Sequence, residues 1–248
     1  TAENVYELTR SISREEQDQF SLESHRRAVA AIESGKFAEE IVPIEVPQRK
    51  GKPLRLEEDE FPKPETTLEK LASLPTVYGS PTVTAGNAPG LDAGAAALVL
   101  MSRQKALSLG IPALATIVAT ASVARQPRYI ASAPADAIDR VLERAGVGLD
   151  DLKLLEINEA FAAVPLVSSK ILADRHYGGD RKRLEALREK LNVNGGAVAV
   201  GHPVGASGAR ILMTLAYELR RRGGGYGACA ICGGLAQADA AVVRCEGS

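Results

Sequence analysis

The stretch "NVNGGAVAVGHPVGASGAR", Asn192 to Arg210, packs glycines densely around a single histidine, His202. Glycine tolerates tight turns and close backbone approach, so this density indicates turns or a ligand cradle. The stretch predicts a glycine turn, a short apolar strand over 197–200, and a second turn that carries His202. Pro203 fixes its own backbone and biases His202 toward an extended conformation. The run "GASGAR" then begins a helix predicted over 206–222.

The start of that helix is a suitable place for negative charge next to His202. Its first backbone N–H groups have no partner within the helix, and the helix dipole adds partial positive charge there. The stretch is not a phosphate loop, because no Lys-Ser/Thr follows the glycines, and its spacing is not the dinucleotide fingerprint. A strand-turn-helix corner with a structural histidine explains the residues equally well, so on this stretch alone both interpretations of His202 stay open.

Around this stretch, alternating strands and helices predict a layered α/β protein with a mostly parallel or mixed sheet. Small and β-branched residues dominate the expected strands, which are 82–86, 95–102, 115–124, 152–158, 227–234 and 240–245. Helices are expected over 103–109, 135–145, 184–191 and 206–222.

The first part of the chain differs in kind from this core. Residues 1–35 predict two helices, with a capping-box spacing between Ser13 and Glu16. The proline-rich stretch 39–67 predicts short edge strands with a hairpin-like turn, followed by an extended surface loop.

Composition limits the class of protein. Hydrophobic residues make up 45% of the 248 residues and charged residues 25%, as in an ordinary soluble globular protein. A net charge of -1 argues against general binding of nucleic acid or of a membrane surface. No apolar run approaches the roughly 20 residues that a membrane-spanning helix needs. The three cysteines, Cys229, Cys232 and Cys245, do not form a secreted disulfide framework, which favours a cytoplasmic location.

Two further stretches carry polar or reactive groups at predicted strand ends. "INEAFA" places Asn158 and Glu159 at the end of one strand, either as a helix cap or as a polar pair aimed into a crevice. "CAICGG" has the spacing of half a metal or redox site. Residues three apart in a strand point to opposite faces, however, so Cys229 and Cys232 cannot share a metal, and no metal site is expected. Cys232 is better interpreted as a thiol presented to a cavity.

Taken in order, "NEAFA", the glycine-histidine stretch and "CGG" resemble the C-terminal blocks of the thiolase family. The upstream stretches "TAENV", "SREEQDQF", "EEIVPIEV" and "TVTAGNAPGLDAGAAALVLMS" are similar to thiolase segments in the same order. The resemblance implies an α/β, thiolase-type layered fold. It assigns 1–80 to the C-terminal part of the loop domain and 81–248 to one βαβαβαββ core half.

Thiolases exchange an acyl group between a nucleophilic cysteine and coenzyme A, cleaving or forming a 3-ketoacyl-CoA. The resemblance implies that His202 takes the proton of the nucleophilic cysteine and offers its ring N–H to the thioester oxygen. Asn158 would hold a water that completes this oxyanion site. Cys232 would move the proton to and from the α-carbon. The backbone N–H of Gly234 would contribute to a second oxyanion site.

The resemblance also implies residues that contact coenzyme A. Lys63 lies where a basic residue of the family contacts adenine or phosphate, and Ala88, Pro89 and Gly90 lie near the pantetheine. Pro89 replaces a common serine and offers no hydroxyl. Acyl-CoA is expected as substrate, with no permanently bound cofactor.

The family's nucleophile precedes the position that matches Thr1, and none of the three cysteines here corresponds to it. The sequence is therefore expected to be a C-terminal portion that lacks the N-terminal half. That half, as a separate chain or a cleaved segment, is the expected partner, within a further homo- or hetero-oligomer. The alternative is a non-catalytic thiolase-like subunit that scaffolds or binds acyl-CoA. A ketoacyl-synthase relative is disfavoured, since that class has histidine where Cys232 stands.

Overall fold

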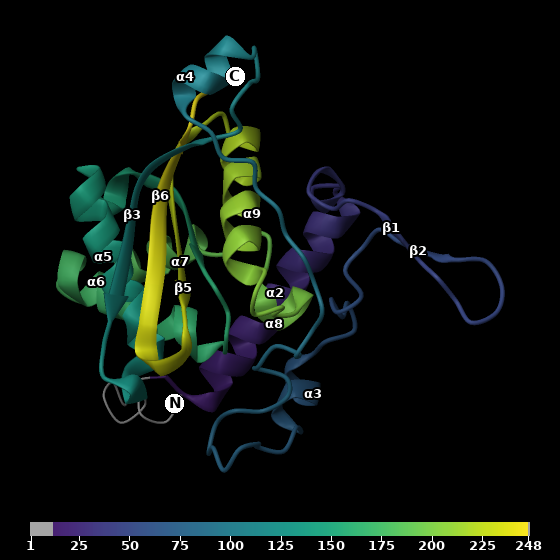
Figure 1. The fold of residues 1–248 in the computed structure, drawn as a ribbon. Coiled ribbons are helices and arrows are strands. Elements are labelled where there is room, and N and C mark those ends of the chain that lie inside the picture. The colour runs from purple at the N-terminus through teal and green to yellow at the C-terminus, as the bar shows by residue number, and fades with distance from the viewer. Residues whose placement is uncertain (1–11, 248) are drawn as a thin grey trace.

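The computed structural model describes residues 12–247, and its centre is a four-stranded mixed sheet with helices on both faces (Figure 1). The strand order is β3-β6-β5-β4, and β4 and β5 run parallel. Strand β6 is antiparallel to both β5 and β3. The predicted α/β class and mixed sheet are confirmed. The strands are β3 (Thr116–Ala124), β4 (Leu152–Ile157), β5 (Gly225–Cys232) and β6 (Gln237–Cys245).

Helices cover the two faces of this sheet unequally (Figure 1). Helix α9 packs alone on one face through Ile211, Leu215 and Leu219, each spaced four residues from the next and at most 1% exposed. This spacing is that of an amphipathic helix whose apolar stripe faces a core. The other face carries α5 and α6, which share the larger hydrophobic core. The bounds are α5 (Ala133–Ala145), α6 (Ala163–Tyr177) and α9 (Ser207–Arg221).

The N-terminal region packs against the edge of this core. Helix α2 starts at the predicted capping box, in which the Ser13 and Glu16 side chains each bond the other's backbone N–H. The predicted hairpin is confirmed as antiparallel strands β1 and β2, which project away from the body (Figure 1). The first of the two helices expected over 1–35 falls largely on residues outside those described. The bounds are α2 (Arg14–Glu33), β1 (Ile44–Val46), β2 (Leu54–Leu56) and α3 (Leu68–Ala72).

One prediction in the C-terminal half is wrong, and one helix there was not predicted. The stretch 197–200 is one turn of helix and no strand, because the N–H groups of Ala199 and Val200 both bond back to the carbonyl of Gly196. Helix α6 was not predicted, because it is apolar over most of its surface and shows no clear helical stripe. The remaining helices are α4 (Arg103–Ser108), α7 (Arg181–Glu189) and α8 (Ala197–Val200).

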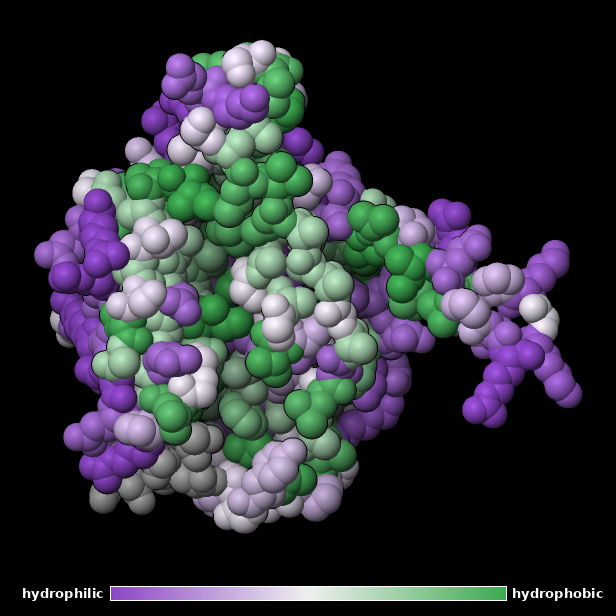
Figure 2. All heavy atoms as spheres, viewed as in Figure 1, coloured by the Kyte–Doolittle hydropathy of each residue, from purple (hydrophilic) through white to green (hydrophobic). Residues whose placement is uncertain are grey.

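Two predicted strands, 82–86 and 95–102, are also wrong. Residues 82–86 form a turn with a single bridge from Thr84 to Thr76. Residues 95–102 have no regular secondary structure, because no other strand within 12–247 lies in position to pair with them. Hydrophobic residues are exposed over much of the face of the molecule that is seen in Figure 2. Exposed apolar side chains along this segment and the adjacent β3 are Leu91, Leu98, Val99, Leu100, Met101, Ile117 and Val118.

Candidate active site

Asn158 lies just past β4, at the carboxyl edge of the sheet. Its N–H donates to the carbonyl of Ala230 at 3.0 Å, which continues the parallel pairing of β4 with β5. The Asn192 amide fixes the end of β4 by accepting from Ile157 N–H and donating to Ile157 O, both at 2.9 Å. The Asn158 side chain is 1% exposed, and its Nδ2 lies 3.3 Å from His202 Nε2. Two residues 44 positions apart, both predicted from sequence, are therefore in contact.

The hydrogen bonds around His202 indicate its tautomer. Its Nδ1 lies 2.7 Å from the hydroxyl of Ser207, and that hydroxyl donates to the carbonyl of Pro203 at 3.1 Å. A serine hydroxyl has one proton, so with this proton committed to Pro203 the oxygen accepts from Nδ1–H. The lone pair of the ring is then on Nε2, facing the Asn158 amide. His202 Nε2 is thus the ring atom that can accept a proton.

The electrostatic surroundings of His202 keep the imidazole neutral. Burial is the largest cause that lowers the pKa of His202, and the positive charge of Arg210 lowers it further. The carboxylate of Asp92 acts in the opposite direction. A histidine whose pKa lies below its usual 6.5 is uncharged at pH 7 and available as a base.

Glu159, the neighbour of Asn158, faces the interior. Its carboxylate accepts from Ser24 Oγ at 2.7 Å, Asn192 Nδ2 at 2.8 Å and Val198 N–H at 3.0 Å. A Cβ on Gly196 would lie 2.3 Å from the Glu159 carboxyl carbon, so only glycine permits this approach. The polar pair predicted at this strand end is therefore divided: Asn158 contacts His202, while Glu159 ties α2 and the glycine-rich stretch to the end of β4.

Glu159→Ala is expected to lower the free energy of unfolding by about 3 kcal/mol, because it leaves three buried donors without an acceptor. Urea unfolding followed by circular dichroism measures this change. The matched control is Glu143→Ala, an exposed position on α5, with an expected change below about 0.5 kcal/mol. A loss below about 1 kcal/mol for Glu159→Ala would contradict the assigned role.

Cys232 ends β5 at the same carboxyl edge as Asn158, two residues beyond Ala230. Burial raises the pKa of the Cys232 thiol to about 11, so the group holds its proton at neutral pH. Cys229 packs in the cluster under α9 and Cys232 against the cluster on the α5 side, which confirms that the two sulfurs point to opposite faces. Gly234 is exposed, and an added Cβ there would meet no atom within 4 Å.

The turn after Cys232 holds two non-glycine residues, Leu235 and Ala236, at φ +60° and +59°. Leu235→Gly is expected to raise the melting temperature, because relief of a left-handed leucine is worth about 1 kcal/mol. Differential scanning calorimetry measures the change. The control is Leu109→Gly, also an exposed leucine but at φ -96°, where glycine should bring no gain. A melting temperature that falls equally in both variants would contradict strain at this turn.

Two of the residues predicted to contact coenzyme A, Lys63 and Gly90, lie next to Phe61. The Lys63 ammonium lies over the Phe61 ring, 5.5 Å from its centroid. A Cβ on Gly90 would lie 2.4 Å from the same ring, so the 88–90 turn and the Lys63 loop are adjacent. Ala88 and Pro89 are half-buried within this turn. The structure thus brings the four predicted residues into one region.

The 88–90 turn is also adjacent to the His202 turn. A Cβ on Gly94 would lie 2.8 Å from the Pro203 ring, and one on Gly201 would lie 2.2 Å from Asp92 Oδ2. Main-chain N–H of His202 donates to that same oxygen at 3.1 Å. A continuous series of contacts therefore runs from Lys63 to the main chain of His202.

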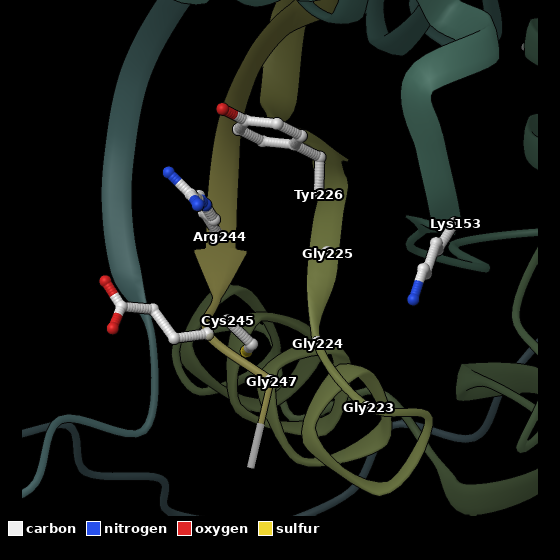
Figure 3. A pocket seen from close by; sticks show the side chains of 9 residues that line it. Lys153, Gly223, Gly224, Gly225, Tyr226, Arg244, Cys245 and Gly247 are labelled. Carbon is white, nitrogen blue, oxygen red and sulfur yellow. The ribbon is translucent and has the colours of Figure 1, made fainter.

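Two cavities lie away from the contact between Asn158 and His202. One of about 610 Å³ lies at the amino ends of β4 and β5, opposite the edge that carries Asn158 and Cys232 (Figure 3). Its lining includes Lys153, Tyr226 and Arg244. Because α/β proteins bind ligands at the carboxyl ends of their strands, this cavity is not the candidate active site. A smaller cavity of about 150 Å³ lies between α2 and the Lys63 loop and is lined in part by His25.

Neither a metal site nor a membrane span is found in residues 12–247. This part of the chain contains no group of three or more His, Cys, Asp or Glu side chains placed to hold a metal ion. None of its helices combines the length and the apolar character needed to cross a bilayer.

Sequence reasoning missed several residues of this site, namely Asp92, Asn192, Ser207 and Arg210. Ser207 lies in the same glycine-rich stretch as His202, and its spacing of five residues could have indicated a hydrogen bond. Asp92 contacts His202 from 110 positions away, and no local pattern in the sequence marks that contact.

Two family models of thiolase domains match the sequence of this chain. The model "Thiolase, C-terminal domain" matches residues 111–245, and "Thiolase, N-terminal domain" matches residues 1–104. The prediction that the chain lacks the N-terminal half is therefore wrong as stated, since it contains sequence from both domains. That finding also removes the support for the N-terminal half as a separate partner chain.

Individual proteins show the same similarity. The acetyl-CoA acetyltransferase of Pseudomonas aeruginosa is 47% identical over 238 residues, which are 96% of this chain and 57% of that protein. The crystal structure of the Bacillus anthracis acetyl-CoA acetyltransferase superposes with a TM-score of 0.88 at 43% identity, covering 98% of this chain and 58% of that one. Human mitochondrial 3-ketoacyl-CoA thiolase in complex with CoA superposes with a TM-score of 0.83 at 37% identity, over 98% and 57% of the two chains. The chain thus spans less than three-fifths of the length of each of these relatives.

Proposed function

Because this chain belongs to the thiolase family, we propose that it supplies acid–base and oxyanion groups for acyl transfer between coenzyme A and a cysteine thioester. The reaction class is cleavage or formation of a 3-ketoacyl-CoA. Residues 1–80 would act as the loop-domain part and 81–248 as the core domain that carries the reactive groups.

The observation that carries this proposal is the contact between Asn158 Nδ2 and His202 Nε2, at 3.3 Å, on the carboxyl edge of the sheet. A neutral His202 with its lone pair on Nε2 can accept a proton from a thiol. Once protonated, the same atom donates to the oxygen of a thioester. Asn158 Oδ1 is buried without a partner, which supports a bound water there as the second donor of the oxyanion site.

Cys232 is the proposed acid and base at the α-carbon. The thiolate form of Cys232 takes the proton as the C–H bond next to the thioester breaks, which makes the neutral thiol, and the electron pair delocalises onto the thioester oxygen. His202, once protonated at Nε2, and the water on Asn158 would stabilise that charge. Because its pKa is about 11, the thiol holds the proton long enough to return it in the reverse step. The backbone N–H of the exposed Gly234 would serve the second oxyanion site.

Acyl-CoA is the proposed substrate, with no resident cofactor. The cluster of Lys63, Phe61 and the 88–90 turn offers a basic group and an aromatic ring beside a half-buried turn for the nucleotide and pantetheine. The relative solved in complex with CoA supports this choice of ligand. A further oligomeric assembly and a cytoplasmic location stay predictions.

The second candidate is a thiolase-like protein that binds acyl-CoA without turnover. All three cysteines lie at position 229 or beyond, so residues 1–104, which match the N-terminal domain, supply no cysteine nucleophile to a site formed by these residues alone.

Exchange of the α-protons of acetyl-CoA in D₂O separates the two functions, because it needs the acid–base groups but no nucleophilic cysteine. The purified chain is expected to incorporate deuterium into the acetyl methyl group faster than buffer alone, measured by mass spectrometry. Calorimetry that shows CoA binding together with exchange at the buffer rate would establish the non-catalytic function. Neither binding nor exchange would contradict both.

A further inference from the structure

Asp92 occupies a position where the 88–94 segment meets the turn that carries His202. Its Oδ2 accepts the main-chain N–H of His202 at 3.1 Å. The side chain is enclosed by two glycines: a Cβ on Gly201 would lie 2.2 Å from Oδ2, and one on Gly90 would lie 3.0 Å from Oδ1. Gly201 has φ +93°, so both its conformation and the approaching carboxylate require glycine there. The turn that carries His202 is thus shaped around this carboxylate.

The same carboxylate touches the turn predicted to contact coenzyme A. A Cβ on Gly90 would meet both the Asp92 carboxylate and the Phe61 ring, so both side chains approach the 88–90 turn at this glycine. Displacement of the 88–90 turn by a bound ligand would therefore move the acceptor of the His202 N–H. Asp92 lies in the region matched by the N-terminal domain and His202 in the region matched by the C-terminal domain, so this contact joins the two.

We propose that Asp92 is a positioning residue, which fixes the His202 imidazole through its main-chain N–H and couples it to occupancy of the 88–90 turn. The coupling to coenzyme A rests on the proposed function, whereas the positioning of the imidazole does not. Asp92 touches no reacting atom and acts only through His202.

The pKa of His202 distinguishes a positioning role of Asp92 from a purely structural one, because it depends on the charge at position 92. The charged groups that act on the imidazole are Asp92 from the 88–94 segment and Arg210 from α9, and its polar contacts are Ser207 and Asn158. Removing the negative charge at position 92 leaves the effect of Arg210 unopposed, so the pKa of His202 falls further. Asp92→Asn keeps an oxygen acceptor for the N–H and removes the charge, while Asp92→Ala removes both.

The test is an NMR titration of the histidine side chains in the full chain, with His202 assigned by loss of its signal in His202→Gln. Asp92→Asn should lower the titration midpoint of His202, and Asp92→Ala should lower it and also broaden or split the signal. The control Asp239→Asn, an exposed carboxylate on β6, should leave it unchanged. A titration midpoint of His202 in Asp92→Asn equal to that of the wild type would overturn the proposal. If Asp92→Ala does not fold, Asp92→Asn alone is sufficient for this test.

Coupling is tested by adding CoA to the same samples. CoA should shift the His202 signal in the wild type and fail to do so in Asp92→Ala at saturation. A ligand-induced shift that survives in Asp92→Ala would overturn the coupling. These titrations require no turnover. A wild-type chain that is inactive in the exchange assay would therefore count against the proposed function. The positioning of His202 would still be decided by the titration midpoints of His202 in the Asp92 variants.

Discussion

Cys232→Ala is expected to reduce the rate of deuterium exchange into acetyl-CoA by about 10²–10⁴-fold, because it removes the only group proposed to take the α-proton. The loss should appear in the exchange rate and leave the affinity for CoA within about threefold, since the thiol does not contact the nucleotide in this scheme. Mass spectrometry measures the first quantity and calorimetry the second.

Cys229→Ala is the matched control, because Cys229 lies on the same strand with its sulfur on the opposite face of the sheet. Exchange by the wild type should also rise between pH 7 and pH 10, as the thiolate fraction grows toward the pKa of about 11. Equal rates in Cys232→Ala and Cys229→Ala would remove Cys232 from the mechanism.

His202→Ala is expected to slow the same exchange by about 10²–10³-fold, the usual effect of deleting one oxyanion donor. The variant also leaves the Asn158 amide without its contact at Nε2. The control is His176→Ala on α6, where the imidazole is bonded to Asp139 at the surface. Near-normal exchange in His202→Ala would show that the thioester oxygen is stabilised elsewhere.

The sequence predicts those parts of this fold that depend on local periodicity. The apolar stripe of α9, the capping box of α2 and the β1–β2 hairpin each follow from side chains close together in the chain. The stretch 95–102 shows the limit, because its small and β-branched residues suit a strand, yet a strand also needs a neighbour to bond.

The residues of the candidate site also fall into two groups, those in short sequence motifs and those that act through contacts distant in the sequence. Asn158, His202 and Cys232 stand in recognisable short motifs, and the structure brings the first two together. Glu159 and Asp92 act through contacts more than 100 positions away, with Ser24 and with His202. Such contacts are set by how the segments pack, so no spacing in the sequence could have shown them.

The central claim is that the imidazole of His202 and the thiol of Cys232 act on one thioester. A crystal structure of the protein with bound acetyl-CoA tests it most directly. The thioester oxygen should lie within hydrogen-bond distance of His202 Nε2, about 2.7–3.2 Å. The methyl carbon should lie about 3.5 Å from Cys232 Sγ. An acetyl group bound beside Lys153 and Arg244, at the opposite end of the strands, would contradict the claim.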